Sequence, residues 1–322
     1  MRTFQGKLAV VTGGGTGMGR ALAEQLSAEG CHVAICDVSA ENMAETRARC
    51  EARAPSGVRI STHVCDVSEE PQVLAFRDAV AVKHGTDHIN LLFNNAGIGG
   101  GGSFLNDTRA EWDKTFGVCW FGVYYCTRAF MPLLVASDDG YIINTSSVNG
   151  FWACLGPSTA HTAYSSAKFA VKGFSEALLV ELRLNAPHVK VAVVMPGHIG
   201  TSIMINTNKV LGKPDALAMG AQDVAVVRDQ LLRRGVPAGD MTDDQIRGLI
   251  HQLTTSFHDD APLTAAQAAT IILDGVRGDA WRILVGDDAQ ILDRMVRESP
   301  DTAYDASFIQ VLHERGLLPW VN

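Results

Sequence analysis

The chain has 322 residues, enough for one large α/β domain or two smaller ones, and 47% of them are hydrophobic, which suffices for a sizeable core. A formal net charge of -8 and an isoelectric point near 5.7 argue against nucleic acid as a main partner. No apolar run approaches the length of a membrane span and few residues precede the first predicted strand, so we expect a cytoplasmic protein with no membrane partner.

Strands and helices alternate from Leu8 to about Gly197. The predicted strands are continuous apolar runs, typical of strands buried on both faces: Leu8–Val11, His32–Cys36, Ile60–Val64, Ile89–Phe93, Tyr141–Asn144 and Val189–Met195. Helices with predicted starts at Ser39, Ser68, Thr108 and Thr162 lie between them. This alternation predicts a doubly wound parallel α/β sheet, in which ligands bind beyond the carboxyl ends of the strands.

A glycine-rich turn, TGGGTGMG (Thr12 to Gly19), follows the first strand and opens a helix. Gly13, Gly17 and Gly19 can take positive φ and let a ligand approach the backbone closely. The unpaired N–H groups and the positive dipole end of the helix suit a pyrophosphate. A flexible turn that binds nothing has the same composition, but the position directly after the first buried strand favours phosphate binding.

Acidic residues follow the second and third strands. Asp37 can accept both hydroxyls of an adenosine ribose and would repel the 2′-phosphate of NADP. Neither Val38 nor Thr16 adds a positive charge, and we expect Arg20 to point into the first helix, so the sequence favours NAD over NADP. A turn or cap role for Asp37 is the alternative.

Asp66, after the third strand, can take the adenine amino group with Val67 packed on the ring, or it can simply cap the next helix. After the fourth strand, the small residues of Asn94-Asn95-Ala96-Gly97 let the cofactor lie close to the sheet, and Asn95 can bond the backbone across neighbouring strands. The glycines from Gly99 to Gly102 predict a mobile loop at the rim of the site, or a spacer.

The residues that carry chemistry follow the fifth strand. Tyr164 and Lys168 are four apart, so they share one face of a helix. A free tyrosine is a poor base at neutral pH, but a nearby lysine cation and a positive nicotinamide would favour the phenolate, which can exchange a proton with an alcohol. Ser147 would hold the substrate oxygen. A tyrosine and lysine at this spacing are a weak signal alone and a strong one in this position, after the serines.

Together these residues resemble the classical short-chain dehydrogenases/reductases, from about Lys7 to Thr201. The resemblance rests on TGGGTGMG, Asp37, Asp66-Val67, NNAG, NTSS, YSSAK and MPGHIGT. It implies a Rossmann sheet of about seven strands and hydride transfer between a nicotinamide and a secondary alcohol or carbonyl. It also implies Tyr164 as the acid/base, Lys168 as the residue that lowers its pKa and holds the nicotinamide ribose, and Ser147 as the residue that orients the substrate.

The cofactor site implied by this resemblance surrounds both ends of the dinucleotide. The amide of the nicotinamide would be held by the backbone of Ile199 and the hydroxyl of Thr201. The expected cofactor-binding residues are Gly13, Gly15, Thr16, Gly17, Met18, Gly19, Asp37, Val38, Asp66, Val67, Asn95, Ala96, Gly97, Thr145, Tyr164, Lys168, Pro196, Gly197, Ile199 and Thr201.

Two features depart from the family pattern. Cys119 occupies the position of an asparagine that supports a water leading to the lysine, and a thiol bonds weakly. Either the backbone carbonyl suffices to hold that water, or the proton relay is impaired. Ser147 and Tyr164 are also a few residues further apart than in compact members, and the extra residues lie in Asn149 to His161.

The remaining segments predict the substrate pocket and the periphery. Ser147, Trp152, His198 and Met204 are the expected substrate-binding residues of an apolar pocket, although these side chains also suit simple packing. The sequence predicts a helical substrate lid over 202–261, a helix over Ala265–Val276, a strand over Arg282–Val285 and a C-terminal helical extension over 286–322 that covers a subunit or a neighbour. We expect one domain, 1–322.

The sequence thus predicts an NAD-dependent dehydrogenase acting on a moderately apolar alcohol or ketone, alicyclic, aromatic or steroid-like. The alternative, favoured only by Cys119, is an NAD-binding redox sensor or partner protein with weak or lost turnover. The resemblance also implies a homotetramer or homodimer built on the helices around Glu111–Ala136 and Tyr164–Leu184. The seven cysteines form no C-x-x-C pair and no cluster has metal-ligand spacing, so we expect no metal and no disulfide framework.

Overall fold

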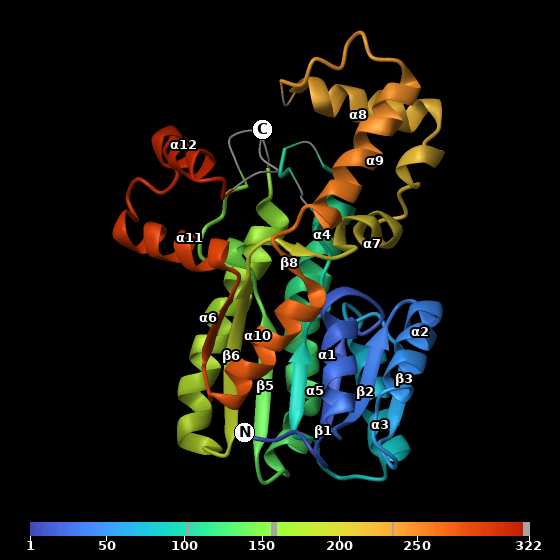
Figure 1. The fold of residues 1–322 in the computed structure, drawn as a ribbon, viewed down its shortest axis with the longest axis vertical. Coiled ribbons are helices and arrows are strands. Elements are labelled where there is room, and N and C mark those ends of the chain that lie inside the picture. Colours follow the sequence, from blue (N-terminus) through green and yellow to red (C-terminus); the bar gives the residue numbers. More distant parts are fainter. Residues whose placement is uncertain (101–102, 106, 156–159, 234, 318–322) are drawn as a thin grey trace.

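The computed structural model describes residues 1–100, 103–105, 107–155, 160–233 and 235–317 (Figure 1). Its main sheet has seven parallel strands in the order β3-β2-β1-β4-β5-β6-β9. The strands are β1 (Leu8–Thr12), β2 (His32–Asp37), β3 (Ile60–Val64), β4 (Leu91–Asn94), β5 (Gly140–Thr145), β6 (Val189–Pro196) and β9 (Arg282–Val285). The predicted doubly wound Rossmann sheet is confirmed.

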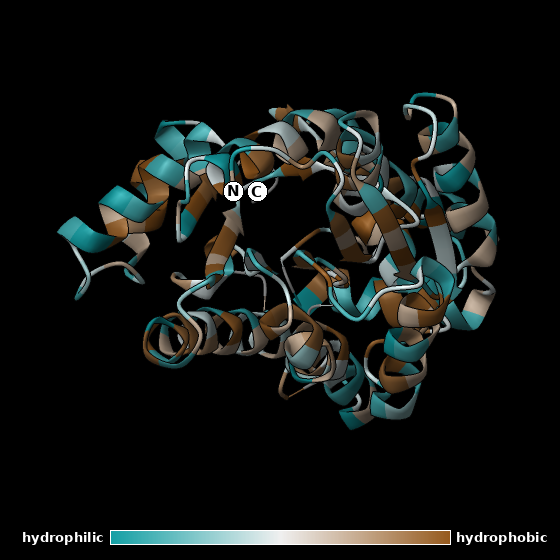
Figure 2. Cartoon of the chain, turned by 90° about the horizontal axis from the view of Figure 1, so that it is seen from below, coloured by the Kyte–Doolittle hydropathy of each residue, from teal (hydrophilic) through white to brown (hydrophobic). Residues whose placement is uncertain are grey.

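Helices cover both faces of this sheet, because alternate strand residues face opposite sides. Val11 belongs to a core shared with α1 (Gly17–Ala28), α2 (Ala40–Glu51) and α10 (Ala265–Arg277). Val10 belongs to a second core, shared with α3 (Glu70–His84), α5 (Gly122–Val135) and α6 (Thr162–Asn185). Figure 2 shows the strands mostly in brown and the surrounding helices in mixed brown and teal, as expected for helices that present one face to a core.

The segment after β6 leaves the sheet and returns to it. It contains β7 (Ile199–Gly200), α7 (Ile203–Val210), the short helix η3 (Ala216–Ala218), α8 (Ala221–Arg233), α9 (Asp243–Asp259) and β8 (Leu263–Thr264). β7 pairs with β8, with Ile199 opposite Leu263, and thereby joins the two ends of the excursion. Of these helices, η3, α8 and α9 share a small core of their own around Val224 and Ile246. The predicted helical content of 202–261 is thus present, and its role as a lid stays a prediction.

The C-terminal helices lie beyond the same end of the sheet as this excursion, on the other side (Figure 1). They are α11 (Asp287–Glu298) and α12 (Ala306–Glu314). Both contribute to a third cluster, in which Leu292 and Leu312 pack with Trp152. The extension therefore covers part of its own chain.

Two predicted helix starts were wrong. Glu69, not Ser68, occupies the N-cap position of α3, because the Ser68 hydroxyl donates to Asp66. α6 already includes Thr162, and His161 occupies its N-cap.

The expectation that no apolar segment approaches the length of a membrane span was also wrong. One continuous helical segment, Arg109–Val135, is long and apolar enough to cross a membrane by length and composition. It is formed by α4 (Arg109–Phe116), the π-helical turn η1 (Gly117–Phe121) and α5. Half of its most apolar part is buried in the fold, and buried core helices pass the same test.

Candidate active site

The glycine turn between β1 and α1 is held by close contacts that exclude side chains. A Cβ on Gly13 would lie 2.8 Å from Ala96 Cα, and one on Gly19 would lie 2.1 Å from the Gly13 carbonyl oxygen. Gly13 and Gly17 also have φ of 65° and 54°, which L-residues rarely adopt. The turn is therefore fixed by packing rather than flexible, and its glycines bring the backbone of α1 close to the carboxyl end of β1.

The N-terminus of α1 is free to bind an anion. Thr16 is its N-cap residue, yet the Thr16 side chain accepts no hydrogen bond from the helix, and the first turn contains no acidic residue. The first N–H groups and the positive dipole end are thus not neutralised locally, which fits a pyrophosphate. Met18 lies beside this turn and packs against the core beneath it.

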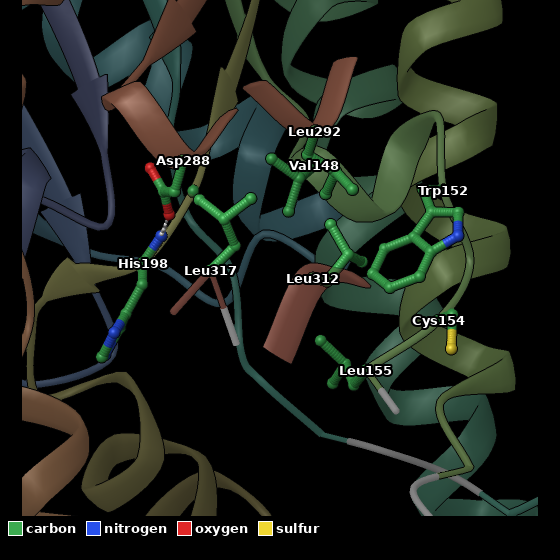
Figure 3. Close-up of a pocket in the computed structure, with 10 residues that line it drawn as sticks. Val148, Trp152, Cys154, Leu155, His198, Asp288, Leu292, Leu312 and Leu317 are labelled. Carbon is green, nitrogen blue, oxygen red and sulfur yellow. Dashed lines mark hydrogen bonds between the residues drawn. The ribbon is translucent and has the colours of Figure 1, made fainter. Parts of the chain in front are cut away.

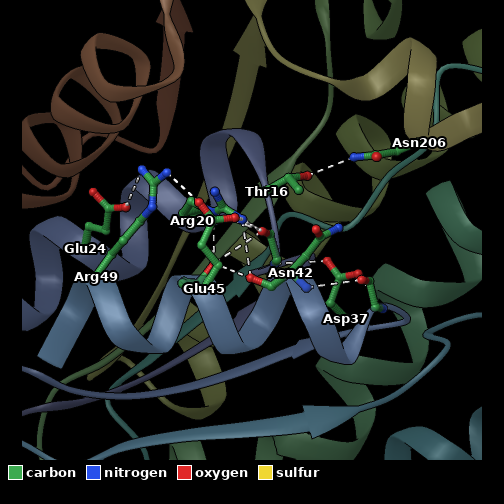
Figure 4. Close-up of polar contacts among 11 residues, drawn as sticks. Thr16, Arg20, Glu24, Asp37, Asn42, Glu45, Arg49 and Asn206 are labelled. Atoms are coloured by element: carbon green, nitrogen blue, oxygen red, sulfur yellow. Dashed lines mark hydrogen bonds and ion pairs between the residues drawn. The ribbon is translucent and has the colours of Figure 1, made fainter.

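Arg20 supports the same turn from outside (Figure 4). Its guanidinium donates to the Gly15 carbonyl oxygen at 2.6 and 3.0 Å and pairs with Glu45 at 2.8 Å. Arg20 thus reaches back to the turn instead of simply following the first helix, contrary to the sequence interpretation. Local sequence could not reveal this contact, because the partners Thr46 and Glu45 come from α2.

The Asp37 carboxylate lies at the end of β2 and faces the glycine turn. It accepts hydrogen bonds from the N–H groups of Gly15 and Ser39, both at 3.0 Å. Next to it, Val38 is half exposed. This position allows the carboxylate to bind a ribose beside the turn. The same carboxylate also stabilises the turn through its two hydrogen bonds, so both interpretations of Asp37 are compatible.

Asp66 is engaged by two neighbours at the end of β3. Lys114 of α4 donates to it at 2.5 Å and the Ser68 hydroxyl at 2.7 Å. These bonds outweigh the effect of burial and lower the pKa of Asp66. Val67 is buried against Gly122 of α5, so little of its side chain is available to a ring outside the fold.

The residues after β4 tie the end of β4 to the end of β1. Asn95 donates its side-chain amide to the Thr12 carbonyl at 3.1 Å, and the Thr12 hydroxyl accepts from the N–H groups of Asn95 and Ala96. A Cβ on Gly97 would lie 3.6 Å from Lys168 Nζ, so this glycine lies beside the catalytic candidate. The expected loop at Gly99–Gly102 falls partly outside the described residues.

Ser147, Tyr164 and Lys168 converge beyond the carboxyl end of β5. Lys168 Nζ donates to the Thr145 carbonyl at 2.9 Å and lies 5.4 Å from the centre of the Tyr164 ring. The Ser146 hydroxyl donates to the Lys168 carbonyl at 2.7 Å, which fixes α6 against the end of β5. Ser147 caps the short helix η2 (Val148–Gly150) by accepting from Asn149 N–H at 3.1 Å.

Burial is the largest influence on the pKa values of Tyr164 and Lys168. It raises the pKa of Tyr164, an effect that the nearby Cys119 reinforces and a hydrogen bond to Ser147 opposes. Burial also lowers the pKa of Lys168. The pKa of Tyr164 is therefore raised rather than lowered, contrary to the effect expected from the lysine. The His161 ring lies tilted against the Tyr164 ring, with centroids 4.6 Å apart, and burial lowers the pKa of His161 to about 4.

Cys119 lies in the π-helical turn η1, fully buried. Its thiol donates to the Ile98 carbonyl at 3.3 Å. The wider turn, in which hydrogen bonds span five residues, places this position between α4 and α5 and is a common feature of functional helices. Cys119 is thus placed beside Gly97 and the lysine, as its alignment with the family asparagine implies.

The segment Pro196–Thr201 crosses the end of β6, and Asp288 of α11 holds it. The Asp288 carboxylate accepts from His198 N–H at 2.7 Å, and a Cβ on Gly197 would lie 2.1 Å from that carboxylate. The His198 ring bonds the Phe257 carbonyl at 2.7 Å, which links this segment to α9. Thr201 lies over the start of α1, 3.3 Å from a Cβ placed on Gly17.

Helix α7 spans the two sides of this region. Asn206 donates to the Thr16 hydroxyl at 2.9 Å (Figure 4), and the Thr207 hydroxyl accepts from Gly99 N–H at 2.7 Å. Met204, on the same helix, is partly exposed near Gly99. Sequence analysis missed Asn206, Thr207 and Asp288, because their partners are about 90 to 190 residues away in the chain.

An apolar pocket lies next to these residues (Figure 3). Trp152 lines it, as expected, but is almost fully buried, and its indole N–H donates to the Ala303 carbonyl at 2.7 Å. Trp152 is thus a packing residue as well as a wall. Among the described residues, no group of three histidine, cysteine or acidic side chains is placed to hold a metal ion.

Comparison with known proteins places this arrangement in a family. A model of the short chain dehydrogenase family matches residues 7–211. SadH of Mycobacterium tuberculosis, named as an oxidoreductase, is 39% identical over 213 residues, which cover 66% of this chain and 74% of SadH. Levodione reductase of Leifsonia aquatica is 33% identical over 214 residues, 65% of this chain and 75% of that protein.

Solved structures agree with this result. A short-chain dehydrogenase/reductase from Burkholderia phymatum in complex with NAD is 28% identical, with a TM-score of 0.74 over 94% of this chain and 96% of that chain. A metagenomic short-chain oxidoreductase in complex with NADP is 32% identical, with a TM-score of 0.54 over 65% of this chain and 90% of that chain. Both nicotinamide cofactors therefore occur among similar structures. The chain belongs to the short-chain dehydrogenase/reductase family and is an oxidoreductase whose fold binds a nicotinamide cofactor.

Proposed function

We propose that the protein is an NAD-dependent oxidoreductase that interconverts a moderately apolar secondary alcohol and its ketone. The observation that carries this proposal is the convergence of Ser147, Tyr164 and Lys168 beyond β5, next to an apolar pocket. The levodione reductase relative is named for a reduction, which is in keeping with a ketone as one of the two partners.

The residues present fit a bound dinucleotide. The unneutralised start of α1 would hold the pyrophosphate, Asp37 the adenosine ribose, and Lys168 the nicotinamide ribose. Pro196, Gly197, Ile199 and Thr201 would line the nicotinamide. When bound, the nicotinamide supplies the site for hydride exchange and, in its oxidised form, a positive charge.

Tyr164 would move the proton. In alcohol oxidation its phenolate takes the hydroxyl proton, and in ketone reduction its hydroxyl returns a proton to the carbonyl oxygen. Because burial raises the pKa of Tyr164, the phenolate depends on positive charge close to it, which Lys168 provides at 5.4 Å from the ring. The Ser147 hydroxyl orients the substrate oxygen toward the tyrosine.

The preference for NAD rests on charge. A 2′-phosphate placed on the ribose would meet the Asp37 carboxylate. Arg20, a cation beside this turn, is already paired with Glu45 and bonded to the Gly15 carbonyl, so it is not available to neutralise a phosphate.

The decisive experiment measures NADH formation from NAD over a panel of apolar secondary alcohols, with Tyr164→Phe and the control Tyr125→Phe alongside. General acid/base catalysis contributes about 10²–10⁴-fold, so Tyr164→Phe should lose about that factor in turnover. The Tyr125→Phe control should retain turnover.

Tight NAD binding without turnover of any alcohol, or of the matching ketone with NADH, would contradict the enzyme proposal. It would favour the redox-sensor function. Recovery of turnover in Cys119→Asn would then identify the thiol as the cause.

We also propose a homodimer or homotetramer built on α5 and α6. α5 and α6 expose Val135, Phe169, Val180 and Leu184, of which Leu184 is 81% exposed, and Phe121 of η1 is exposed just before α5. Light scattering after size-exclusion chromatography measures the mass directly. A monomer at micromolar concentration would contradict this proposal.

A further inference from the structure

The contact between β6 and β9 ends on a side chain rather than on the backbone. At the end of this ladder, Gly197 N–H donates to the Val285 carbonyl at 3.0 Å. β9 stops at Val285 and α11 begins two residues later, so the strand supplies no partner for the following N–H group. That group, the backbone N–H of His198, donates instead to Oδ2 of Asp288 at 2.7 Å (Figure 3).

Two glycines give the Asp288 carboxylate its place. A Cβ on Gly197 would lie 2.1 Å from its Oδ2, and a Cβ on Gly286 would lie 2.2 Å from its Oδ1. Gly286 also has a φ of 107°, which L-residues rarely adopt. The carboxylate thus fills the space that side chains at both positions would need, and its location relative to the end of β6 is fixed.

His198 is held from the opposite side as well. Its ring bonds the Phe257 carbonyl of α9 at 2.7 Å and packs against the Phe257 ring, with centroids 4.5 Å apart. His198 is buried between these contacts. The backbone at this position is therefore tied to α9 through the ring and to α11 through the N–H group.

The residue that follows is the one proposed to bind the nicotinamide amide. Ile199 lies opposite Leu263 in the ladder between β7 and β8. Because the peptide unit is planar and rigid, a shift of the backbone at His198 carries the backbone of Ile199 with it. A misplacement of about 1 Å near reacting groups can cost about 10² in rate, so the position of this peptide matters to hydride transfer.

The bond to Asp288 is of the stronger kind. Hydrogen bonds to an ionised acceptor are roughly twice as strong as those between neutral groups. Without the carboxylate, a buried backbone N–H would lose its acceptor, and the segment would have to move to find another. Cofactor binding would then have to order a segment that the wild-type protein already holds in place.

We propose that Asp288 is a positioning residue for the nicotinamide: by accepting from His198 N–H, it holds the backbone of Ile199 where the amide of the cofactor binds. This inference rests on the proposed function, in which residues 196–201 line the nicotinamide. Asp288 acts through the backbone and exchanges no proton with the substrate.

The test compares NADH with ADP-ribose, which has the same pyrophosphate and both riboses but no nicotinamide. Calorimetry measures both affinities for the full-length wild type, Asp288→Ala, Asp288→Asn and Asp287→Ala. Asp287→Ala is the matched control, because Asp287 carries the same charge in the same first turn of α11 but is exposed. Circular dichroism melts establish folding. Asp288→Leu, of similar shape and without an acceptor, replaces the alanine variant if that variant does not fold.

Asp288→Ala should lower the NADH affinity by about tenfold, the effect of losing one charge-assisted hydrogen bond, and leave the ADP-ribose affinity unchanged. Asp288→Asn should recover most of the NADH affinity, because its amide oxygen can still accept from the His198 N–H. Asp287→Ala should bind both ligands as the wild type does. With an alcohol that the wild type oxidises, Asp288→Ala should also lower kcat by about tenfold, and Asp288→Asn should restore it.

The outcomes separate this inference from the proposed function. An unchanged ratio of NADH to ADP-ribose affinity in Asp288→Ala overturns the inference, and so does an equal loss in Asp288→Asn. A wild type that binds NADH but turns over no alcohol contradicts the proposed function, while the ratio still decides the role of Asp288. A wild type that binds NADH no more tightly than ADP-ribose overturns the inference, because the nicotinamide then gains nothing from the segment.

Discussion

Replacing Asn206 by alanine tests whether α7 retains the cofactor. Its side-chain amide donates to the Thr16 hydroxyl at 2.9 Å, across 190 residues of sequence, at the turn proposed to hold the pyrophosphate. A net hydrogen bond of this kind contributes about 0.5–1.5 kcal/mol. If that bond breaks before the cofactor leaves, its loss should speed NADH release by about fivefold, which corresponds to about 1 kcal/mol.

The assay follows the decay of NADH fluorescence after rapid mixing of the protein–NADH complex with excess NAD. Asn208→Ala is the matched control, because two helical positions rotate the same side chain by about 200° to the other side of α7. An unchanged release rate in Asn206→Ala would refute the reasoning. An equal acceleration in Asn208→Ala would show that general loosening of α7, and not this bond, controls release.

Three further predictions concern other parts of the molecule. Asp37→Ser should raise the affinity for NADPH relative to NADH by about tenfold or more in fluorescence titrations, because a like-charge contact is removed, and an unchanged ratio would count against Asp37 as the discriminator. Trp152→Ala should lower the free energy of unfolding by about 3–5 kcal/mol in urea titrations, whereas Trp281→Ala, 41% exposed, should change it by less than about 1 kcal/mol, and similar losses would be inconsistent with this packing. Burial, assisted by Arg59 and two neighbouring histidines, lowers the pKa of His84 from 6.5 to about 4, so the unfolded chain takes up the proton first. Stability should therefore fall by about 3 kcal/mol between pH 6.5 and pH 4, and His84→Gln should remove this part of the pH dependence; identical urea midpoints against pH in both proteins would disprove it.

Much of the fold could be predicted because its signals are local. Most strands are short apolar runs buried as predicted, although β3 (ISTHV) is only partly buried, and Thr242 and Thr264 each form a capping box with the glutamine three residues later. The fourth strand begins at Leu91, later than expected, because the Asn90 side chain accepts from Leu8 N–H and precedes the ladder. Such errors of one or two residues arise where a side chain competes with the regular pattern.

The active site could be predicted only where motifs define it. Tyr164 and Lys168 share a helical face, and the glycine turn must follow β1, so their placement follows from spacing. The contacts Trp152–Ala303, His198–Asp288 and Asn206–Thr16 join elements that are distant in the chain and carry no periodic signal. They depend on how the segment between β6 and α10 and the C-terminal helices pack against the sheet, which only the three-dimensional structure reveals.

The short ladder between β7 and β8 has an evolutionary consequence. Because Ile199 and Leu263 are opposite each other in this parallel ladder, the chain leaves and re-enters the main fold at almost the same place. The 62 residues from 201 to 262 can therefore be lengthened, shortened or exchanged at little cost to the sheet, since closure entropy grows only slowly with loop length. Natural selection can thus diversify this module by insertion and recombination while the ancestral scaffold beneath it is inherited unchanged.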